Sequence, residues 1–392
     1  MNKIYMDHAA TTPVYPEVLE EMNQYFTEEY GNPSSIHQGG QNAVRAIKKS
    51  RKKVADFINA DNELEITFCG SGTEADNLAI KGVALALKEK GKHIITSKIE
   101  HSAVLNSCKY LEKYHDFNIT YLDVDHNGFV NPKDVKEAIN SDTILISIMM
   151  VNNEIGTIEP IKEIGEIAEK NNVFFHTDAV QGPGHLEIDV NKLKVNLLSL
   201  SAHKFNGPKG VGALYHQKGI KLISQISGGP QENHKRASTE NVPAIVGMGK
   251  AAEITKKRMN KNNNKLEKLR DTLISGIEKN IDKVFLNGPR KNKRINNNIN
   301  FSFKDISGES LLINLDMNGV AAASGSACAS GTLEVSHVLK AIDLSPDLAE
   351  GSLRLTLGEN NSIEDINYII KLLPGIIQKL RNMSPKYNGK IE

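Results

Sequence analysis

Short apolar runs alternate with helix-like segments over residues 65–215, and this alternation limits the fold most strongly. The runs at 93–97, 143–148 and 173–178 are almost continuously apolar. Such strands are typical of a parallel sheet that its connecting helices bury on both faces. We therefore predict an α/β fold with a mostly parallel, seven-stranded type of sheet. The expected strands cover residues 65–69, 93–97, 118–124, 143–148, 173–178, 195–200 and 211–215.

The pattern changes after residue 244. A long helical region over 244–280 precedes shorter strands and helices, which indicates a smaller α+β domain. We place a large domain at residues 15–255 and a small domain at 1–14 together with 256–392. In the large domain, Pro16 is suited to open a helix, and Ser34 or Ser35 is suited to cap the next one.

Charge and cysteine content narrow the function classes. The chain has 48 Lys and Arg against 47 Asp and Glu, a net charge of +1, which favours neither a nucleic acid nor an anionic membrane as a partner. No apolar run approaches the ~20 residues that span a bilayer, and the first residues are too polar for a secretory signal. Three cysteines without a Cys-x-x-Cys pair are not a disulfide framework. We therefore expect a cytoplasmic protein.

One lysine follows directly after a predicted strand. The apolar run 195–200 ends at Ser201, and Gly207 and Pro208 stop any further regular element. Lys204 thus lies at the edge where open α/β sheets bind ligands. A lysine that is partly desolvated there can lose its proton and attack a carbonyl group. The alternative is an ordinary surface lysine, because most lysines are exposed.

A phosphate site and a ring partner are expected at neighbouring strand ends. The segment 70–74 (Gly-Ser-Gly-Thr-Glu) closes a strand and opens a helix, so its backbone N–H groups can face an anion. It matches neither a P-loop nor the dinucleotide fingerprint, and a simple capped turn is the alternative. Asp178 ends another strand, where a carboxylate can neutralise a protonated ring nitrogen or cap the next turn.

Other polar residues flank these strand ends. Ser201 and His203 precede Lys204 at alternate positions and could complete the phosphate site. His101 could stack on an aromatic ring or transfer protons near neutral pH. Asn153 lies on a loop after a strand and is suited to a hydrogen bond with a ring hydroxyl. Ordinary polar loop residues are the alternative for Ser201 and His203, and a histidine at a helix start is the alternative for His101, favoured for any histidine considered alone.

A cysteine and an arginine in the last quarter of the chain also carry chemistry. Cys328 lies in the segment 324–331 (Ser-Gly-Ser-Ala-Cys-Ala-Ser-Gly), whose small residues leave the thiol accessible as a nucleophile; a small buried cysteine is the alternative. Cys69 and Cys108 are interpreted as structural. Arg354 lies in an apolar strand and needs an anion if buried, either a substrate carboxylate held bidentately or an internal ion pair.

With these residues in place, the chain closely resembles the NifS/IscS-type (class I) cysteine desulfurases, which are pyridoxal phosphate-dependent enzymes of aminotransferase fold type I. The resemblance covers nearly the whole chain. Each matching stretch alone is weak evidence for the family, but the whole set in this order is specific to it. The stretches lie at residues 7–13, 31–35, 73–75, 100–101, 151–156, 176–181, 201–204, 236–241, 324–331 and 353–358.

The resemblance implies a role for each matching residue. Lys204 carries pyridoxal 5'-phosphate, Cys328 receives the sulfur as a persulfide, and His101 stacks on the ring and transfers protons. A further role of Cys328 as a transient iron–sulfur ligand is implied as well. Asn32 and Arg354 hold the carboxylate of the L-cysteine substrate. The cofactor-binding set is Gly72, Thr73, Asn153, Asp178, Gln181, Ser201, His203 and Lys204, with Thr239 contributed by the other subunit of a homodimer.

The implied reaction converts L-cysteine to L-alanine and passes the sulfur to an iron–sulfur scaffold protein or another acceptor. A selenocysteine lyase, a sulfur donor for tRNA thiolation and a class V aminotransferase are the alternatives. An aminotransferase would not need Cys328. A non-catalytic iron–sulfur carrier would need several cysteines at cluster spacing, which this sequence does not offer.

Overall fold

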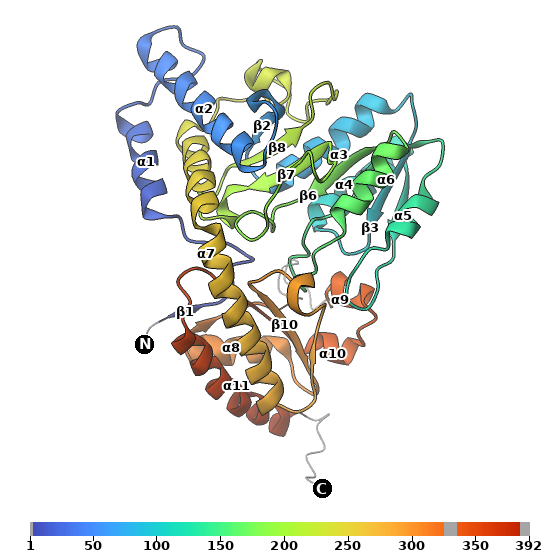
Figure 1. The fold of residues 1–392 in the computed structure, drawn as a ribbon, viewed down its shortest axis with the longest axis vertical. Coiled ribbons are helices and arrows are strands. Elements are labelled where there is room, and N and C mark those ends of the chain that lie inside the picture. Colours follow the sequence, from blue (N-terminus) through green and yellow to red (C-terminus); the bar gives the residue numbers. More distant parts are fainter. Residues whose placement is uncertain (1–2, 325–334, 385–392) are drawn as a thin grey trace.

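The computed structural model describes residues 3–324 and 335–384. A larger upper part surrounds the central sheet, and a smaller part lies below it (Figure 1). Helix α7 (Val242–Asn280) runs from the upper part into the lower one without a break. The N-terminal arm starts on the lower part, because β1 (Ile4–Tyr5) pairs in parallel with β11 (Val320–Ala321). The domain boundary at residue 255 stays a prediction and falls inside α7.

The central sheet has seven strands in the order β2-β8-β7-β6-β5-β3-β4. All neighbouring pairs are parallel except those of β8, which is antiparallel to both β7 and β2. The predicted α/β fold class with a mostly parallel sheet is therefore confirmed. The strands are β2 (Ile66–Cys69), β3 (His93–Ser97), β4 (Asn118–Leu122), β5 (Thr143–Ser147), β6 (Phe174–Asp178), β7 (Leu197–Ser201) and β8 (Gly212–His216).

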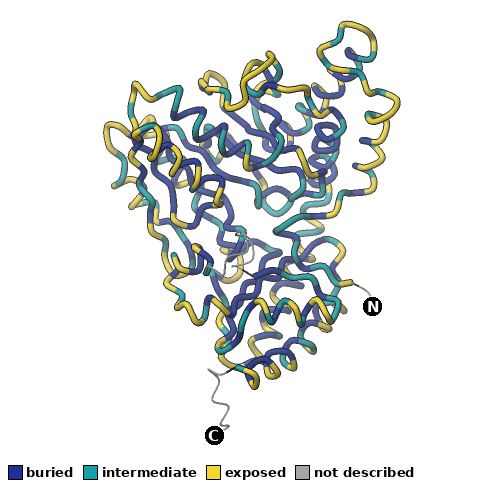
Figure 2. Tube along the Cα trace, turned by 180° about the vertical axis from the view of Figure 1, so that it is seen from behind, coloured by how far each residue is buried: buried dark blue, intermediate teal, exposed yellow. Residues whose placement is uncertain are grey.

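Both faces of this sheet are covered, which is why its strands are almost continuously apolar. Successive side chains point to opposite faces, so Ile94 packs with α3 and α4 while Ile95 packs with the helices of the other face. Figure 2 shows the buried trace that results through the centre of the upper part. The helices are α1 (Pro16–Thr27), α2 (Gln38–Phe57), α3 (Gly72–Leu87), α4 (Ser102–His115), α5 (Pro132–Ala138) and α6 (Ile161–Lys170).

The lower part has its own apolar core. Its three-stranded antiparallel sheet has the order β12-β10-β9, and the second half of α7 packs on it through Leu266 and Leu273. The elements are β9 (Val284–Leu286), β10 (Asn298–Phe303), β12 (Ser352–Thr356), α8 (Gly308–Met317), α9 (His337–Ala341), α10 (Pro346–Glu350) and α11 (Ile363–Met383). Short 3-10 turns cover Glu63–Glu65, Ala202–Lys204, Gln231–His234 and Lys291–Lys293.

Two helix starts test the local predictions. Helix α1 begins at Pro16, as predicted. The prediction that Ser34 or Ser35 caps the next helix is wrong, because α2 begins at Gln38 and the His37 side chain accepts the Gly40 N–H (3.3 Å). Asn32 explains the difference: its Oδ1 accepts the Ser34 N–H (2.9 Å), and this local turn delays the helix.

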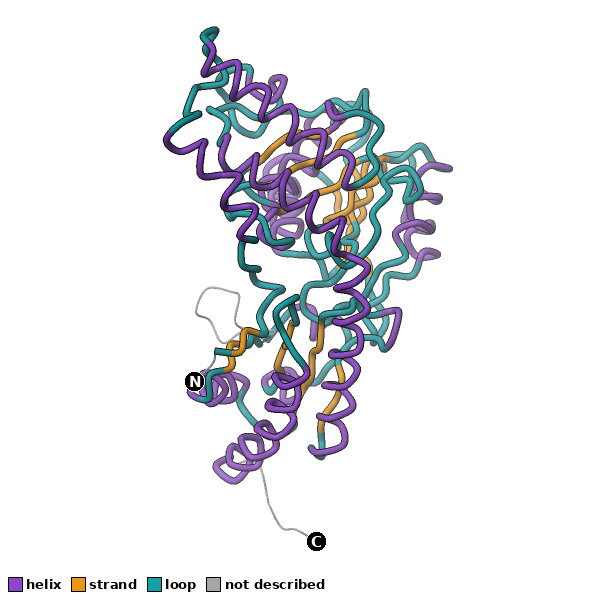
Figure 3. Tube along the Cα trace, turned by 60° about the vertical axis from the view of Figure 1, so that its left-hand side comes forward, coloured by secondary structure: helices purple, strands orange, loops and turns teal. Residues whose placement is uncertain are grey.

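The strand ends meet between the two parts of the molecule. Strands β3, β5, β6 and β7 are parallel, so the residues that follow them lie at one edge of the sheet. Figure 3 shows loops and turns crowded between this sheet and the lower part. The predicted site residues at the ends of β6 and β7, Asp178 and Ser201, lie on this edge. The described helices include none that is long and apolar enough to cross a membrane.

Candidate active site

Lys204 lies where the sequence predicts it, in the 3-10 turn that follows β7. Its side chain is partly buried, and its Nζ donates hydrogen bonds to the backbone carbonyls of Ala9 and Ala10, the latter at 2.9 Å. Gln181 Nε2 donates to the same Ala9 carbonyl (3.0 Å). The N-terminal arm therefore holds the amine at the sheet edge, next to a second residue of the predicted cofactor site.

Asp178 is a buried carboxyl group at the end of β6, with Oδ1 accepting the Val180 N–H (2.9 Å). Burial raises its pKa, while the charges of His101 and Lys204 and the Val180 amide oppose that rise. The charge of Lys204 and the Val180 N–H stabilise the carboxylate form. A carboxylate here suits a protonated ring nitrogen, as predicted.

A second carboxyl group, Asp76 of α3, lies behind Asp178. Side-chain atoms of Asp76, His101 and Asp178 lie within 4.8 Å of one another. The Asp76 pKa is raised well above its usual value by burial and by the charge of Asp178. Two carboxylates this close and this buried cannot both ionise readily, and the stronger rise in pKa falls on Asp76, where neither His101 nor Lys204 opposes it.

The N-terminus of α3 forms a tight cradle. A Cβ atom on Gly72 would lie 2.8 Å from Val180 Cγ2 and 3.2 Å from Ser201 Cβ, so only glycine fits without a shift. Ser201 is buried beside this first helical turn, and Thr73 is exposed on it. Free N–H groups at a helix start, together with a hydroxyl group, favour a phosphate. The predicted phosphate residues Gly72 and Ser201 are thus brought together.

His203 and Thr239 complete the predicted cofactor set. His203 Nδ1 lies 3.1 Å from Thr11 Oγ1, and burial together with Lys204 and Lys209 lowers its pKa to about 4. The ring is therefore neutral near pH 7. Thr239 is exposed on the loop before α7.

The loop that carries Thr239 is tied to the phosphate cradle. Arg236 forms an ion pair with Glu74 of α3 (2.8 Å). This places the loop beside the first turn of α3 in the same chain, while the resemblance assigns Thr239 to the site of the partner subunit.

His101 and Arg354 come from different parts of the molecule, His101 from the start of α4 and Arg354 from β12. His101 is exposed and caps α4, with Nδ1 accepting the Ala103 N–H (3.2 Å). Arg354 of β12 is buried, and its Nη1 donates to the Asn153 carbonyl (3.0 Å). The Asn153 side chain is half-buried. The strand arginine therefore reaches the sheet edge from the lower part of the molecule.

Asn32 is not brought to this group. It is exposed in the turn between α1 and α2, and its Oδ1 serves the Ser34 N–H. Its substrate role stays a prediction that rests on the resemblance alone.

Cys328 lies outside the described residues, but the residues on both sides of its segment lie at the site. Ala323 and Arg354 exchange both backbone hydrogen bonds (2.7 and 3.1 Å). On the other side, Ser336 Oγ donates to Glu154 (2.5 Å), the residue after Asn153. His337 Nε2 lies 2.9 Å from the carbonyl of Glu100, next to His101.

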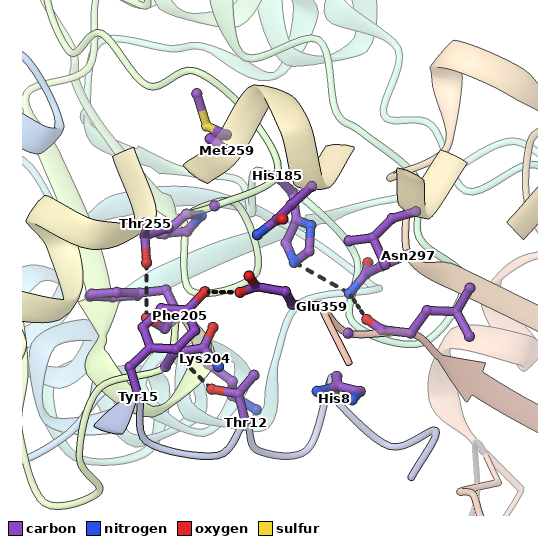
Figure 4. A pocket seen from close by; sticks show the side chains of 17 residues that line it. His8, Thr12, Tyr15, His185, Lys204, Phe205, Thr255, Met259, Asn297 and Glu359 are labelled. Carbon is purple, nitrogen blue, oxygen red and sulfur yellow. Dashed lines mark hydrogen bonds between the residues drawn. The ribbon is translucent and has the colours of Figure 1, made fainter. Parts of the chain in front are cut away.

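A small cavity lies between Lys204 and α7 (Figure 4). Its volume is about 40 Å³, enough for water but not for a cofactor. Burial lowers the pKa of both His8 and His185 there to about 4, so these two rings are neutral. Tyr15 donates its hydroxyl to Glu359 across the cavity (2.8 Å). Of the predicted cofactor-binding residues, which all lie in the described part of the chain, Lys204 alone lines this cavity.

Sequence reasoning missed three contributions. Asp76 could have been found from the sequence, because it is a charged residue among the small apolar residues of α3, such as Ala75 and Ala79. Asp7, which pairs with Arg354, lies in a stretch noted only for its resemblance. The backbone carbonyls that hold the lysine have no sequence signal, since every residue carries one.

The chain matches the family model for aminotransferase class-V over residues 4–369. The chain belongs to the aminotransferase class-V family. Within this family it is 54% identical over 387 residues to cysteine desulfurase IscS of Clostridium botulinum, covering 98% of this chain and 97% of the relative. It is 56% identical over 383 residues to cysteine desulfurase IscS of Dictyoglomus turgidum, covering 98% and 96%.

Solved structures of similar proteins agree with this class-V assignment. A NifS-like protein superposes with a TM-score of 0.90 at 36% identity, covering 96% of this chain and all of the other. A structure described as SspA in complex with cysteine gives a TM-score of 0.79 at 36% identity, covering 92% and 100%. The predicted resemblance to cysteine desulfurases is thus confirmed. Pyridoxal phosphate, the predicted cofactor, is the cofactor of this family.

Proposed function

We propose that this chain is a cysteine desulfurase that converts L-cysteine to L-alanine and keeps the sulfur as a persulfide on Cys328. One observation carries the proposal. The segment that bears Cys328 begins and ends beside the residues expected to bind the substrate. Cys328 lies four positions after Ser324, so an extended chain spans at most about 14 Å between them. Ser324 follows Ala323, which pairs with Arg354.

The cofactor-binding roles fit the geometry of the strand ends. Lys204 Nζ would carry pyridoxal phosphate, Asp178 would face its ring nitrogen, and Gly72 with Ser201 would hold its phosphate. Gln181 and Asn153 remain the proposed partners of the ring oxygen. When bound, pyridoxal phosphate withdraws electrons from the substrate and so weakens its carbon–sulfur bond.

The chain's own residues supply positioning and proton transfer. Arg354 binds the substrate carboxylate through N–H groups that include the buried Nε, which has no hydrogen-bond partner among the described residues. Lys204 Nζ would accept the proton from the substrate α-carbon. His101, exposed at the start of α4, exchanges protons with the sulfur and the leaving carbon.

The sulfur step balances without an oxidant. The Cys328 thiolate attacks the substrate sulfur, a sulfur–sulfur bond forms, and the bond between sulfur and the β-carbon breaks. The electron pair stays with carbon, which takes a proton to become the methyl group of alanine. An unperturbed thiol has a pKa of about 8.5, so proton transfer to a base such as His101 assists the attack near pH 7.

The Cys328→Ser variant tests this proposal. We expect it to bind pyridoxal phosphate and to change the visible cofactor spectrum on adding L-cysteine, because the binding residues are untouched. It should form no alanine above background and carry no persulfide detectable by mass spectrometry. Cys108→Ser, at a buried helix position, serves as the control with wild-type turnover. Sustained sulfide release by Cys328→Ser would contradict the role of Cys328.

The partners of the enzyme form the second part of the proposal. A homodimer is supported by large apolar side chains that are exposed around α1 and the following turn, including Phe26, Tyr30 and Ile36, which is 94% exposed. Thr239 would then complete the cofactor site of the partner subunit. An iron–sulfur scaffold protein is the proposed sulfur acceptor, with Cys328 as a transient cluster ligand during transfer. A cytoplasmic location fits this role.

A further inference from the structure

Asp7 of the N-terminal arm forms an ion pair with Arg354, with Asp7 Oδ1 at 2.9 Å from Arg354 Nη2. The Arg354 side chain is 3% exposed, whereas the Asp7 side chain is 22% exposed. A buried N–H group without an acceptor is unfavourable. Asp7 Oδ1 therefore gives Arg354 Nη2 an acceptor at a fixed position when no substrate carboxylate is bound.

The contacts of Arg354 fix one side of its guanidinium group and leave another open. Nη2 contacts Asp7, and Nη1 donates to the Asn153 carbonyl (3.0 Å). Arg354 Nε is buried and has no hydrogen-bond partner among the described residues. A buried donor without a partner is unfavourable, and an incoming carboxylate would satisfy it. The two tethers thus orient the remaining donors towards one position.

The backbone of Asp7 is itself fixed on the strand that carries the arginine. Asp7 bridges in parallel to Thr356 of β12, and the Thr356 N–H donates to the Met6 carbonyl (2.8 Å). The Tyr5 hydroxyl donates to the Asp7 carbonyl (3.0 Å). Arg354 stands two positions before Thr356 on β12, so their side chains share one face of the strand. The ion pair follows from this pairing of arm and strand.

The same arm also holds the reactive amine. Two residues after Asp7, the Ala9 carbonyl accepts from both Lys204 and Gln181, and the Ala10 carbonyl accepts from Lys204. The carboxylate-binding arginine and the lysine therefore contact the same short segment. The distance between these two groups sets where the α-carbon of an amino acid can lie.

We infer that Asp7 is a positioning residue for Arg354 and sets the affinity and selectivity of the site for the α-carboxylate of its amino-acid substrate. This inference deepens the proposed function and rests on it, because it takes Arg354 as the carboxylate-binding residue. Asp7 contacts the substrate only through the arginine.

Two variants of Asp7 and two substrates test the inference. Asp7→Ala removes the tether, and Asp7→Asn keeps an acceptor oxygen at the same place. With L-cysteine, we expect Asp7→Ala to raise KM about tenfold or more and to change kcat much less, and Asp7→Asn to stay within about threefold of wild type. L-cysteine methyl ester has no carboxylate, so its KM should change less than about twofold in both variants.

The ester separates positioning from general damage to the fold. An Asp7→Ala variant in which L-cysteine and its ester lose affinity equally, or in which neither does, would overturn the inference. So would an Asp7→Asn variant as impaired as Asp7→Ala, because charge and not position would then be decisive.

Failure of the proposed function can be told apart in the same experiment. If the wild-type enzyme formed no alanine from L-cysteine, the proposed reaction would be wrong. The Asp7 inference would still be measured by the spectral titration of the holoenzyme with L-alanine and L-alanine methyl ester, where only the free carboxylate should depend on Asp7. Equal Asp7 dependence of these two ligands would overturn it.

Discussion

Gly72 is the position at which the cofactor site can be tested most directly. It is the first residue of α3, and a Cβ atom there would lie 2.8 Å from Val180 Cγ2 and 3.2 Å from Ser201 Cβ. Neither neighbour can move alone, because Val180 donates its amide to Asp178 and Ser201 ends β7. Gly72→Ala should therefore push the proposed phosphate-binding hydroxyl and the proposed ring-nitrogen partner out of place.

The size of the effect follows from two opposing terms. Extra volume in a packed site costs about 1–3 kcal/mol, whereas alanine is favoured over glycine inside a helix by about 1 kcal/mol. The free energy of unfolding should thus fall by about 0–2 kcal/mol. Cofactor affinity has no such compensation, and a displacement that costs about 1.4 kcal/mol in binding raises the Kd about tenfold.

The assay is a titration of cofactor-free protein with pyridoxal phosphate, followed by the visible absorbance of the bound form. We expect a Kd at least about tenfold higher for Gly72→Ala, and a smaller loss for pyridoxal, which has no phosphate. Gly375→Ala in α11 is the matched control, since a Cβ atom added there would have nothing within 4 Å, and this variant should bind as wild type. Wild-type affinity of Gly72→Ala for pyridoxal phosphate would refute the assignment of the phosphate site.

Two further predictions concern buried carboxyl groups. Burial raises the pKa of Glu154 to about 7. The native state therefore binds this proton more tightly than the unfolded chain does. As pH rises from about 4.5 to 7, the native protein loses the part of its stability that this bound proton provides. Relative to wild type, Glu154→Gln should therefore gain free energy of unfolding across this window, by at most about 1.4 kcal/mol per pH unit. Urea denaturation of both proteins at several pH values measures this. A difference in free energy of unfolding that does not change with pH would contradict the prediction. Burial and the Asp178 charge raise the pKa of Asp76, which favours its neutral form. Asp76→Asn should therefore leave the pH titration of the visible cofactor band unchanged, while Asp178→Asn shifts it; a shift in Asp76→Asn would show that Asp76 carries charge.

Much of the fold could be predicted from the sequence, because its strands are short apolar runs that helices bury on both faces. The strands that end at Ser97, Asp178 and Ser201 were expected within one or two residues of these positions. Parallel strands bring their C-terminal ends to one edge, so residues far apart in the chain could be placed together without any structure. The start of α2 could not be predicted from the sequence. The Asn32 side chain accepts the Ser34 N–H, and this turn replaces the helix cap that a serine could have formed.

The site residues that escaped prediction depend on contacts between distant parts of the chain. Arg354 was correctly expected to need an anion, but an internal ion pair and a substrate carboxylate were alternatives. The structure contains the internal ion pair, in which Asp7 contacts Nη2. Arg354 Nε is buried without a hydrogen-bond partner among residues 3–324 and 335–384, and the substrate carboxylate stays a proposal.

Nothing local in the sequence marks Asp7 as the partner, since the pair spans 347 positions and exists only because the arm lies along β12. The same holds for the two alanine carbonyls that receive the Lys204 amine. The type of a side chain indicates in the sequence which chemistry it can perform. A backbone carbonyl gives no such indication, because every residue has one, and its role depends only on where the fold places it.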